Sequence, residues 1–256
     1  MVLALSLVSV LGTPSPTRAS TTDTAAVMAT EFQTWLNRDR VAAGLVPLRP
    51  WPSLVSLATT RAARMAAANV MSHTAAGGYV GTALNAASIP WLGFGEIIGN
   101  SSYPWGTQAA TNLYGMWKHS APHAAIMFSA TFNYFGAAFM RRSDGTTWAS
   151  VVFTVSPDHT RPTAYNGRLA RSGTTVSFSW SGRDARLQTH TAGLRSFDLE
   201  YRVDGGAWRL IKNDTTATSI RLTRRPAGHV YWFRVQAADR RGNLSRWTTP
   251  VHVRVP

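Results

Sequence analysis

The hydrophobic period of this 256-residue sequence changes once, near residues 156–167. Before that point, apolar side chains recur every three to four residues in several stretches, a spacing typical of helices packed on one face. After it, apolar and polar residues alternate, which is typical of half-buried strands. The break itself reads SPDHTRPTAYNG, and its proline and small polar residues indicate a linker. The pattern therefore predicts two domains, a mixed one followed by an all-β one.

In the first part, helical spacing and turn residues delimit three helices. They are predicted from Thr24 to Gly44, from Pro52 to about Asn69, and over 107–119, with Pro122 as a helix breaker. Residues 133–142 and 146–155 are strand-like and are joined through SDG, a good hairpin turn. Residues 74–105 are rich in Gly, Ser, Pro and Ala, so irregular chain is expected there. Helices flanking a short antiparallel sheet predict an α+β domain with three layers, α-β-α.

The second part contains short alternating segments at regular spacing. Strands are predicted over 176–180, 197–203, 207–211, 219–223, 230–237 and 251–255. The turn residues DGG and GN separate some of them. About 90 residues of such strands are typical of an all-β sandwich.

Composition excludes several classes of site. The chain has no cysteine, so it has no disulfide, no cysteine-ligated zinc and no thiol catalysis. Its formal charge is +14, and residues 157–256 contribute most of it, with 17 basic and 7 acidic side chains, a net +10. Such a surface favours a polyanionic partner at the cell envelope, such as an acidic glycan or lipid headgroups, although a solvated basic surface is the simpler alternative. Nothing indicates a specific nucleic-acid partner, and the oligomeric state is left open.

The N-terminus reads as an export signal. Residues 1–11 are almost wholly apolar and are followed by GTPSPTRAS. Ten or so apolar residues are too few to span a bilayer, which needs roughly 20. A signal peptide over residues 1–19, cleaved after Ala19, fits better, although a basic residue before the apolar run is missing. We therefore expect a secreted protein that is not integral to a membrane.

One acidic residue stands out. Glu96, in GFGEIIGN, is the only carboxylate between Asp39 and Asp144. A carboxylate in such an apolar setting is costly to bury unless a cation or hydrogen-bond donors meet it. The nearest candidates along the chain are three histidines, His73, His119 and His123. Two imidazoles and a carboxylate can hold a divalent metal, so the pattern predicts a metal site, with a surface glutamate and unrelated histidines as the alternative.

Several motifs in the first part occur together in one known family. The run NRDRVAAG through NVMSH, then GEII, WKHSAPH and FNYFGAAF, resembles in order the CAP superfamily, whose members are SCP-like extracellular domains. The match covers about residues 25–155 and is similar to the bacterial, cysteine-free branch. The resemblance implies an α-β-α sandwich with a cleft lined by two histidines, His73 and His123, and by Glu96. Many members carry a second glutamate where this chain has Ser120, so one candidate base is missing.

The second part resembles a fibronectin type III domain. Trp180 matches its core tryptophan, and Tyr231 matches its corner tyrosine. Such modules in secreted bacterial proteins resemble spacers or adhesive units and imply no catalytic residue. The predicted organisation is a signal peptide (1–19), a CAP/SCP-like domain (24–156), a linker (157–167) and a fibronectin-like sandwich (168–256).

The resemblance implies a particular division of roles at the cleft. His73 and His123 would bind zinc or another divalent cation, and Glu96 would be a third ligand or would hydrogen-bond a metal-bound water. Glu96 is also the only catalytic candidate, since zinc can lower the pKa of bound water to about 7. The alternative is a purely structural cluster in which Glu96 pairs with a protonated histidine.

Other side chains are candidates for the rim of the cleft. His119 and Ser120 are close to His123 in sequence, but Ser120 lacks the orienting acid and oxyanion motif of a nucleophile. The aromatic residues Trp91, Tyr103 and Trp105 flank the Glu96 segment, where they could stack on a glycan or lipid or could simply close the core.

Three functions follow from these observations. The first is a secreted binding protein whose cleft takes a divalent metal and a lipid, glycan or peptide at the cell envelope. The second is a metal-dependent hydrolase of cell-wall or protein substrates. The third is a structural or adhesive protein with a vestigial cleft. Whether the protein is an enzyme stays open at this stage.

Overall fold

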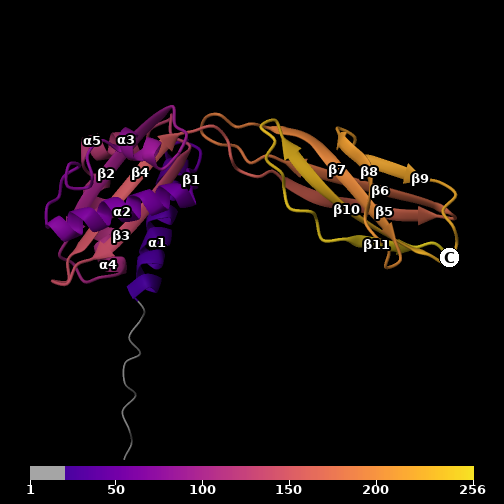
Figure 1. Ribbon diagram of the computed structural model, residues 1–256, viewed down its shortest axis with the longest axis horizontal. Coiled ribbons are helices and arrows are strands. Elements are labelled where there is room, and N and C mark those ends of the chain that lie inside the picture. The colour runs from indigo at the N-terminus through magenta and orange to yellow at the C-terminus, as the bar shows by residue number, and fades with distance from the viewer. Residues whose placement is uncertain (1–20) are drawn as a thin grey trace, which may run out of the picture.

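The computed structural model describes residues 21–256, which form two domains in chain order (Figure 1). The predicted signal peptide lies outside the described residues. The predicted fold class, an α-β-α sandwich followed by an all-β sandwich, is confirmed.

The first domain is built from five helices and four strands of the described chain. The helices are α1 (Thr21–Ala42), α2 (Pro52–Ala68), α3 (Val80–Ala86), α4 (Thr107–Lys118) and α5 (Ala121–Met127). The strands are β1 (Arg49–Pro50), β2 (Gly93–Ser101), β3 (Tyr134–Arg141) and β4 (Thr147–Val155). The sheet order is β1-β3-β4-β2, with β1 parallel to β3 and the other pairs antiparallel. This order places β2 at one edge.

The helices cover both faces of this sheet. Helix α1 buries Met28, Phe32 and Leu36, one per turn, in the same core cluster as α4. On the opposite face, α2 lies so close to β3 that a Cβ added at Gly136 would meet the backbone of Leu54 at 2.2 Å. Helix α2 ends at Asn69, whose left-handed conformation (φ 54°) is one that asparagine tolerates.

Residues 74–105 are more regular than predicted. They contain α3 and all of β2, which pairs with β4 without interruption from Gly93 to Ser101. The glycines of this strand serve packing and not turns. A Cβ at Gly99, for example, would lie 2.8 Å from the side chain of Leu113 on α4. The prediction of irregular chain was wrong because glycine content alone cannot distinguish close packing from a turn.

Pro122 begins a helix where the sequence predicted only an end. Ser120 is the N-cap of α5, and the proline lies in the first turn. A missing N–H costs nothing there, because the first N–H groups of a helix have no internal partner. His123 therefore lies within α5, not in a loop after α4.

The second domain is a sandwich of two antiparallel sheets. One has the order β11-β10-β7-β8 and the other β5-β6-β9. The strands are β5 (Thr163–Ser172), β6 (Thr175–Arg183), β7 (Leu194–Val203), β8 (Arg209–Thr215), β9 (Ser219–Leu222), β10 (Val230–Asp239) and β11 (Val251–Arg254). Trp180 and Tyr231 are both buried in the core between the sheets. Strand β5 begins at Thr163, inside the segment predicted as a linker, since its tyrosine and leucine pair with β6.

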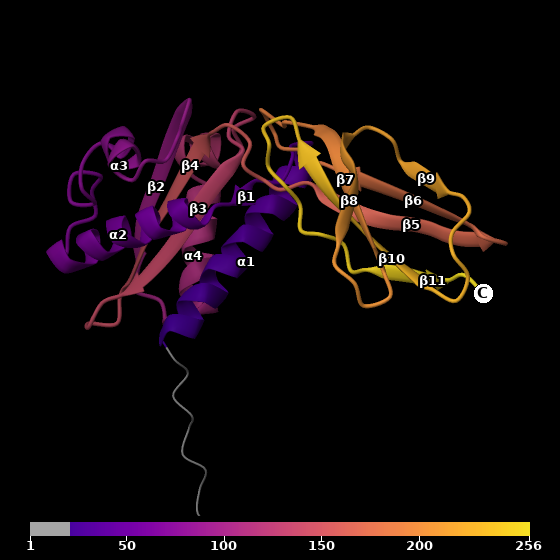
Figure 2. The same ribbon diagram turned by 45° about the vertical axis from the view of Figure 1, so that its right-hand side comes forward.

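The two domains meet through the loop that connects β6 to β7 (Figure 2). Its Leu187 is 1% exposed and belongs to a core cluster of the first domain. Gln188 accepts a hydrogen bond from the backbone N–H of Val46 at 2.7 Å, and the Thr189 carbonyl accepts one from Asn133 at 3.1 Å. The junction thus combines a buried apolar side chain with directional hydrogen bonds, as a specific interface between domains does.

The segment between the domains adds an aromatic contact. The His159 ring stacks on Tyr134, with centroids 4.3 Å apart, and contacts Trp51 in a tilted arrangement, with centroids 3.8 Å apart. Burial lowers the pKa of this histidine.

Within residues 21–256, no helix combines the length and the apolarity that a bilayer crossing requires.

Candidate functional site

Glu96 lies in the middle of β2 and is 7% exposed. Four donors surround its carboxylate. Arg61 donates from Nε to Oε1 at 2.5 Å and from Nη2 to Oε2 at 2.7 Å, a bidentate pair. Ser150 on β4 donates to Oε1 at 2.8 Å, and Nδ1 of His73 lies 2.7 Å from Oε2. Each carboxylate oxygen therefore has two partners.

Arg61 is the residue of this cluster that the sequence analysis did not find. It lies on α2, and its side chain and that of Glu96 are each only 1% exposed. A signal for it was present, because Arg61 falls on the buried stripe of α2, between Ala58 and Ala62. A charged residue on such a stripe requires a buried partner. The lone carboxylate of the first domain's interior is that partner.

His73 follows α2 in a short loop and has a side chain that is 58% exposed. Because a carboxylate only accepts hydrogen bonds, Nδ1 carries the proton in this contact. In the neutral ring the other nitrogen, Nε2, is then an acceptor. Nη2 of Arg61 also donates a hydrogen bond to the carbonyl of Gly78 at 2.9 Å, which anchors the loop that carries His73.

A shallow pocket of about 410 Å³ opens beside this cluster. His73 and Glu96 line it together with Thr74, Gly78, Tyr79, Val80 and Phe94. The Tyr79 ring is edge-on to Phe94 with centroids 5.1 Å apart, and Tyr79 is 66% exposed. The pocket thus joins one imidazole to an aromatic wall.

His123, the third residue of the predicted metal site, does not line this pocket. It lies on α5, which packs with α4 against the face of the sheet opposite to α2. Its Nδ1 is 2.7 Å from Oγ of Ser120, and no hydrogen bond in the described chain links it to Glu96. The Ser120–His123 contact is a local one, between the side chains of the N-cap residue of α5 and its third residue.

The remaining candidate residues are scattered. Trp91 lies beside the pocket, edge-on to Phe94 at 5.0 Å, and donates from Nε1 to Asn85. Tyr103 is 53% exposed beyond the end of β2, and Trp105 packs against the core on the α1 side. His119 is the C-cap of α4. None of the three predicted aromatic residues lines the pocket, and of the three only Trp91 contacts a lining residue, Phe94.

The residues present fit a metal only in part. Both oxygens of Glu96 are engaged by Arg61 and two further donors, so this side chain has little capacity left for a cation. His73 and His123 each have Nδ1 bonded to an oxygen and Nε2 free. The structure places Glu96 in a hydrogen-bonded cluster with Arg61, Ser150 and His73. The zinc site at His73, Glu96 and His123 stays a prediction.

Comparison with known proteins assigns the first domain. Residues 35–156 match the model of the CAP family, described as the cysteine-rich secretory protein family. The first domain is a CAP domain. No curated protein sequence matches the chain.

Solved structures resemble each domain. An outer surface protein from Borrelia burgdorferi is 14% identical, with a TM-score of 0.46, covering 50% of this chain and 92% of that protein. An extracellular protein with an SCP domain from Bacillus anthracis is 19% identical, with a TM-score of 0.45, covering 56% of this chain and 45% of that protein. A Fn3-like protein from Clostridium thermocellum is 20% identical, with a TM-score of 0.28, covering 38% of this chain and 96% of that protein. The chain thus spans less than half of the Bacillus protein.

Proposed function

We propose that this chain is an exported binding protein whose CAP domain holds a short acidic glycan in the pocket beside His73. The observation that carries the proposal is the saturation of Glu96. Arg61 and Ser150 hold its carboxylate, which in turn holds Nδ1 of His73, and the His73 side chain lines the pocket. A carboxylate bonded to one nitrogen of a histidine fixes the tautomer and orientation of the ring, and so prepares the other nitrogen to bind a ligand.

The chemistry of the pocket favours a sugar. A sugar ring offers hydroxyl donors for Nε2 of His73 and an apolar face for the exposed ring of Tyr79. The net positive charge of the whole chain, most of which lies in residues 157–256, favours an acidic glycan over a neutral one through the long-range field of the protein. A pocket of about 410 Å³ lies at the small end of the usual range for ligand sites, which suits one or two sugar units.

Binding fits this geometry better than hydrolysis does. A general base needs a free lone pair within reach of the proton that it takes, and Glu96 already accepts four bonds. Ser120 and His123 are hydrogen-bonded, but no acid in the described chain orients that histidine. Nε2 of His73 is the atom that would hold a divalent cation in this pocket, and Glu96 would orient the ring from behind.

The test is calorimetry with short oligosaccharides that carry carboxylate groups, and separately with zinc. We expect His73→Ala and Tyr79→Ala to weaken glycan binding at least tenfold. His119→Ala is the matched control, because it removes an imidazole that lies outside the pocket. Glycan binding that is unchanged in His73→Ala would overturn the proposal. Release of shortened sugars that stops in Glu96→Gln would instead establish a hydrolase.

Zinc gives an independent result. One equivalent of zinc bound by the parent and lost in His73→Ala would support the metal proposal for this pocket. Loss in His123→Ala as well would show that both histidines bind one ion.

Export is supported by the pattern of the first 19 residues and by the family, and N-terminal sequencing of the secreted protein tests it.

A further inference from the structure

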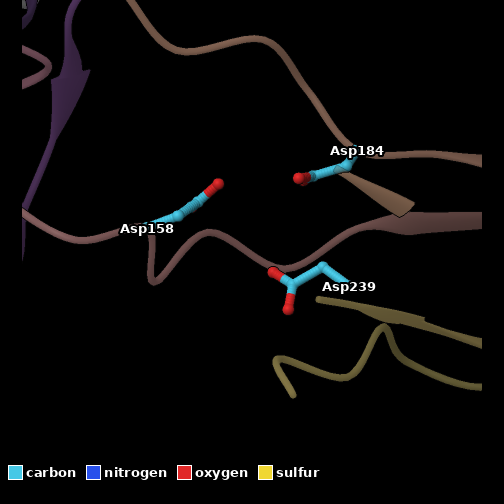
Figure 3. A group of neighbouring side chains, drawn as sticks. All are labelled: Asp158, Asp184 and Asp239. Atoms are coloured by element: carbon cyan, nitrogen blue, oxygen red, sulfur yellow. The ribbon is translucent and has the colours of Figure 1, made fainter. Parts of the chain in front are cut away.

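A cluster of three aspartates lies at the domain junction, far along the chain from the pocket. Asp158 follows β4 in the connecting segment, Asp184 begins the loop between β6 and β7, and Asp239 ends β10. One carboxylate oxygen from each lies within 4.8 Å of the others. Figure 3 shows that the carboxyl groups of Asp158 and Asp184 point toward each other, with Asp239 beside them. The chain thus gathers three acids from three distant segments.

Two of the three are deeply buried, and their hydrogen bonds fix their orientation. Asp158 is 3% exposed and Asp239 is 0% exposed. Asp158 accepts three hydrogen bonds on Oδ1 but only one, from the N–H of Ala192, on Oδ2. Asp239 accepts two backbone N–H bonds on Oδ1 and one amide bond, from Asn243, on Oδ2. Each therefore keeps an oxygen with a spare lone pair.

The third acid has an oxygen with no partner at all. Oδ2 of Asp184 accepts a hydrogen bond from the N–H of Gly193 at 2.7 Å. Its Oδ1 is buried, with less than 1 Å² accessible, and accepts no hydrogen bond. A buried carboxylate oxygen without a partner is costly, and native structures rarely leave one without an ion or a water.

No positive side chain of the described residues forms an ion pair with the cluster. None of the ion pairs of residues 21–256 includes Asp158, Asp184 or Asp239. Burial raises the pKa of Asp184, and the charges of Asp158 and Asp239 raise it further. Three acids in this space therefore have hydrogen-bond donors but no paired cation.

We propose that Asp158, Asp184 and Asp239 bind a calcium ion that locks the two domains together. Calcium takes oxygen ligands at about 2.3–2.6 Å, so two oxygens on one ion are at most about 5 Å apart. Oxygens within 4.8 Å of one another satisfy this limit. Three hard carboxylates also suit calcium better than zinc, which prefers nitrogen and sulfur.

The position of the site gives the ion a mechanical role. The loop between β6 and β7 carries the residues that dock on the CAP domain, including Leu187 and Gln188. Asp184 begins this loop, while Asp158 and Asp184 accept the backbone N–H groups of Ala192 and Gly193 at its end. A cation at the three acids would therefore fix both ends of the docking loop. Calcium sets the rigidity of the domain junction.

The experiment is calcium titration of the full chain after treatment with a chelator and buffer exchange, read by calorimetry and by thermal unfolding. We expect about one equivalent of calcium, with a dissociation constant on the order of 10⁻⁴ M, typical of extracellular sites. We also expect a higher unfolding midpoint with calcium than with chelator. Asp184→Asn should bind at least tenfold more weakly and should lose that increase. Asn keeps the acceptor for Gly193, so this variant should fold.

The controls separate a site from a general effect of ions. Asp204→Asn removes an exposed carboxylate of the same domain outside the cluster and should bind calcium as the parent does. Sodium chloride of equal ionic strength should not raise the midpoint. The proposal is overturned if the parent shows no calcium heat and no midpoint increase, which would leave a shared proton as the compensating charge. It is equally overturned if Asp184→Asn retains the parent's affinity.

Discussion

The buried ion pair between Arg61 and Glu96 allows a quantitative prediction of the stability of the CAP domain. Arg61→Met should destabilise the domain strongly, because it leaves the carboxylate of Glu96 with only Ser150 and His73 as partners. Both members of the pair are 1% exposed, so water cannot replace the lost guanidinium. Breaking a buried pair by removing one partner costs about 3–5 kcal/mol. For a domain of this size the unfolding midpoint should fall by roughly 10–20 °C.

A double variant shows whether the cost belongs to the stranded charge. In Arg61→Met/Glu96→Leu no carboxylate is buried, and an apolar pair of similar volume can replace an ion pair with little loss. We expect the double variant to recover at least half of the stability that Arg61→Met loses. The coupling energy from the four proteins then measures the interaction directly.

Urea unfolding followed by circular dichroism gives the free energies, and hydrogen exchange of β2 amides assigns the change to the first domain. Arg38→Met is the matched control, since Arg38 pairs with Asp39 but its side chain is 63% exposed. An exposed pair should change stability little. The reasoning is refuted if Arg61→Met costs less than about 1 kcal/mol, or if the double variant loses the sum of the two single losses.

Three further predictions concern packing and pH. Gly136→Ala should cost about 1–3 kcal/mol, because its Cβ would overlap the backbone of α2, whereas Gly115→Ala on α4 has open space and should be neutral or stabilising by chemical denaturation. Leu187→Ala should cost about 2–5 kcal/mol in the unfolding of the CAP domain, since this side chain is 1% exposed in that domain's core; no loss would contradict the docking. Hydrogen bonds from Arg38, and also from Lys118 and Tyr114, lower the pKa of Asp39 well below its ordinary value. This contribution is present above about pH 4 and is lost as pH falls through the folded-state pKa, so Asp39→Asn should be less stable than the parent at pH 7, and the gap should close in acid.

Most of the fold could be predicted from local patterns. Helices α1, α2 and α4 carry buried residues once per turn, and the strands of the second domain alternate, so periodicity alone locates them. The errors fall where a residue type has two structural meanings. The glycines of β2 allow a strand to lie close to α4, and the same residues in another chain would form turns. Pro122 lies in the first turn of α5, and sequence spacing alone cannot distinguish a proline that begins a helix from one that breaks it.

The candidate site was predictable only in outline. The sequence indicated that Glu96 would be buried and that His73 would meet it, and the structure brings those two together. The sequence could not show which face of the sheet each helix covers. That choice, made by the packing of α2 on one side and of α4 and α5 on the other, brings Arg61 to Glu96 and leaves His123 with Ser120.

The two acidic clusters of this chain answer the same physical requirement in different ways. A buried carboxylate needs a compensating charge or enough donors. At Glu96 the chain supplies both, through Arg61 and the hydroxyl and imidazole beside it, so the acid has a partner for each lone pair and serves His73. At Asp184, which is partly buried, Gly193 donates to Oδ2 while Oδ1 is buried without a hydrogen bond, and two further acids lie within reach. The Glu96 cluster is therefore the poorer metal site, although it contains a histidine, because its carboxylate already has all its partners. The three-aspartate cluster has no histidine, but it is the one in which we propose an external cation.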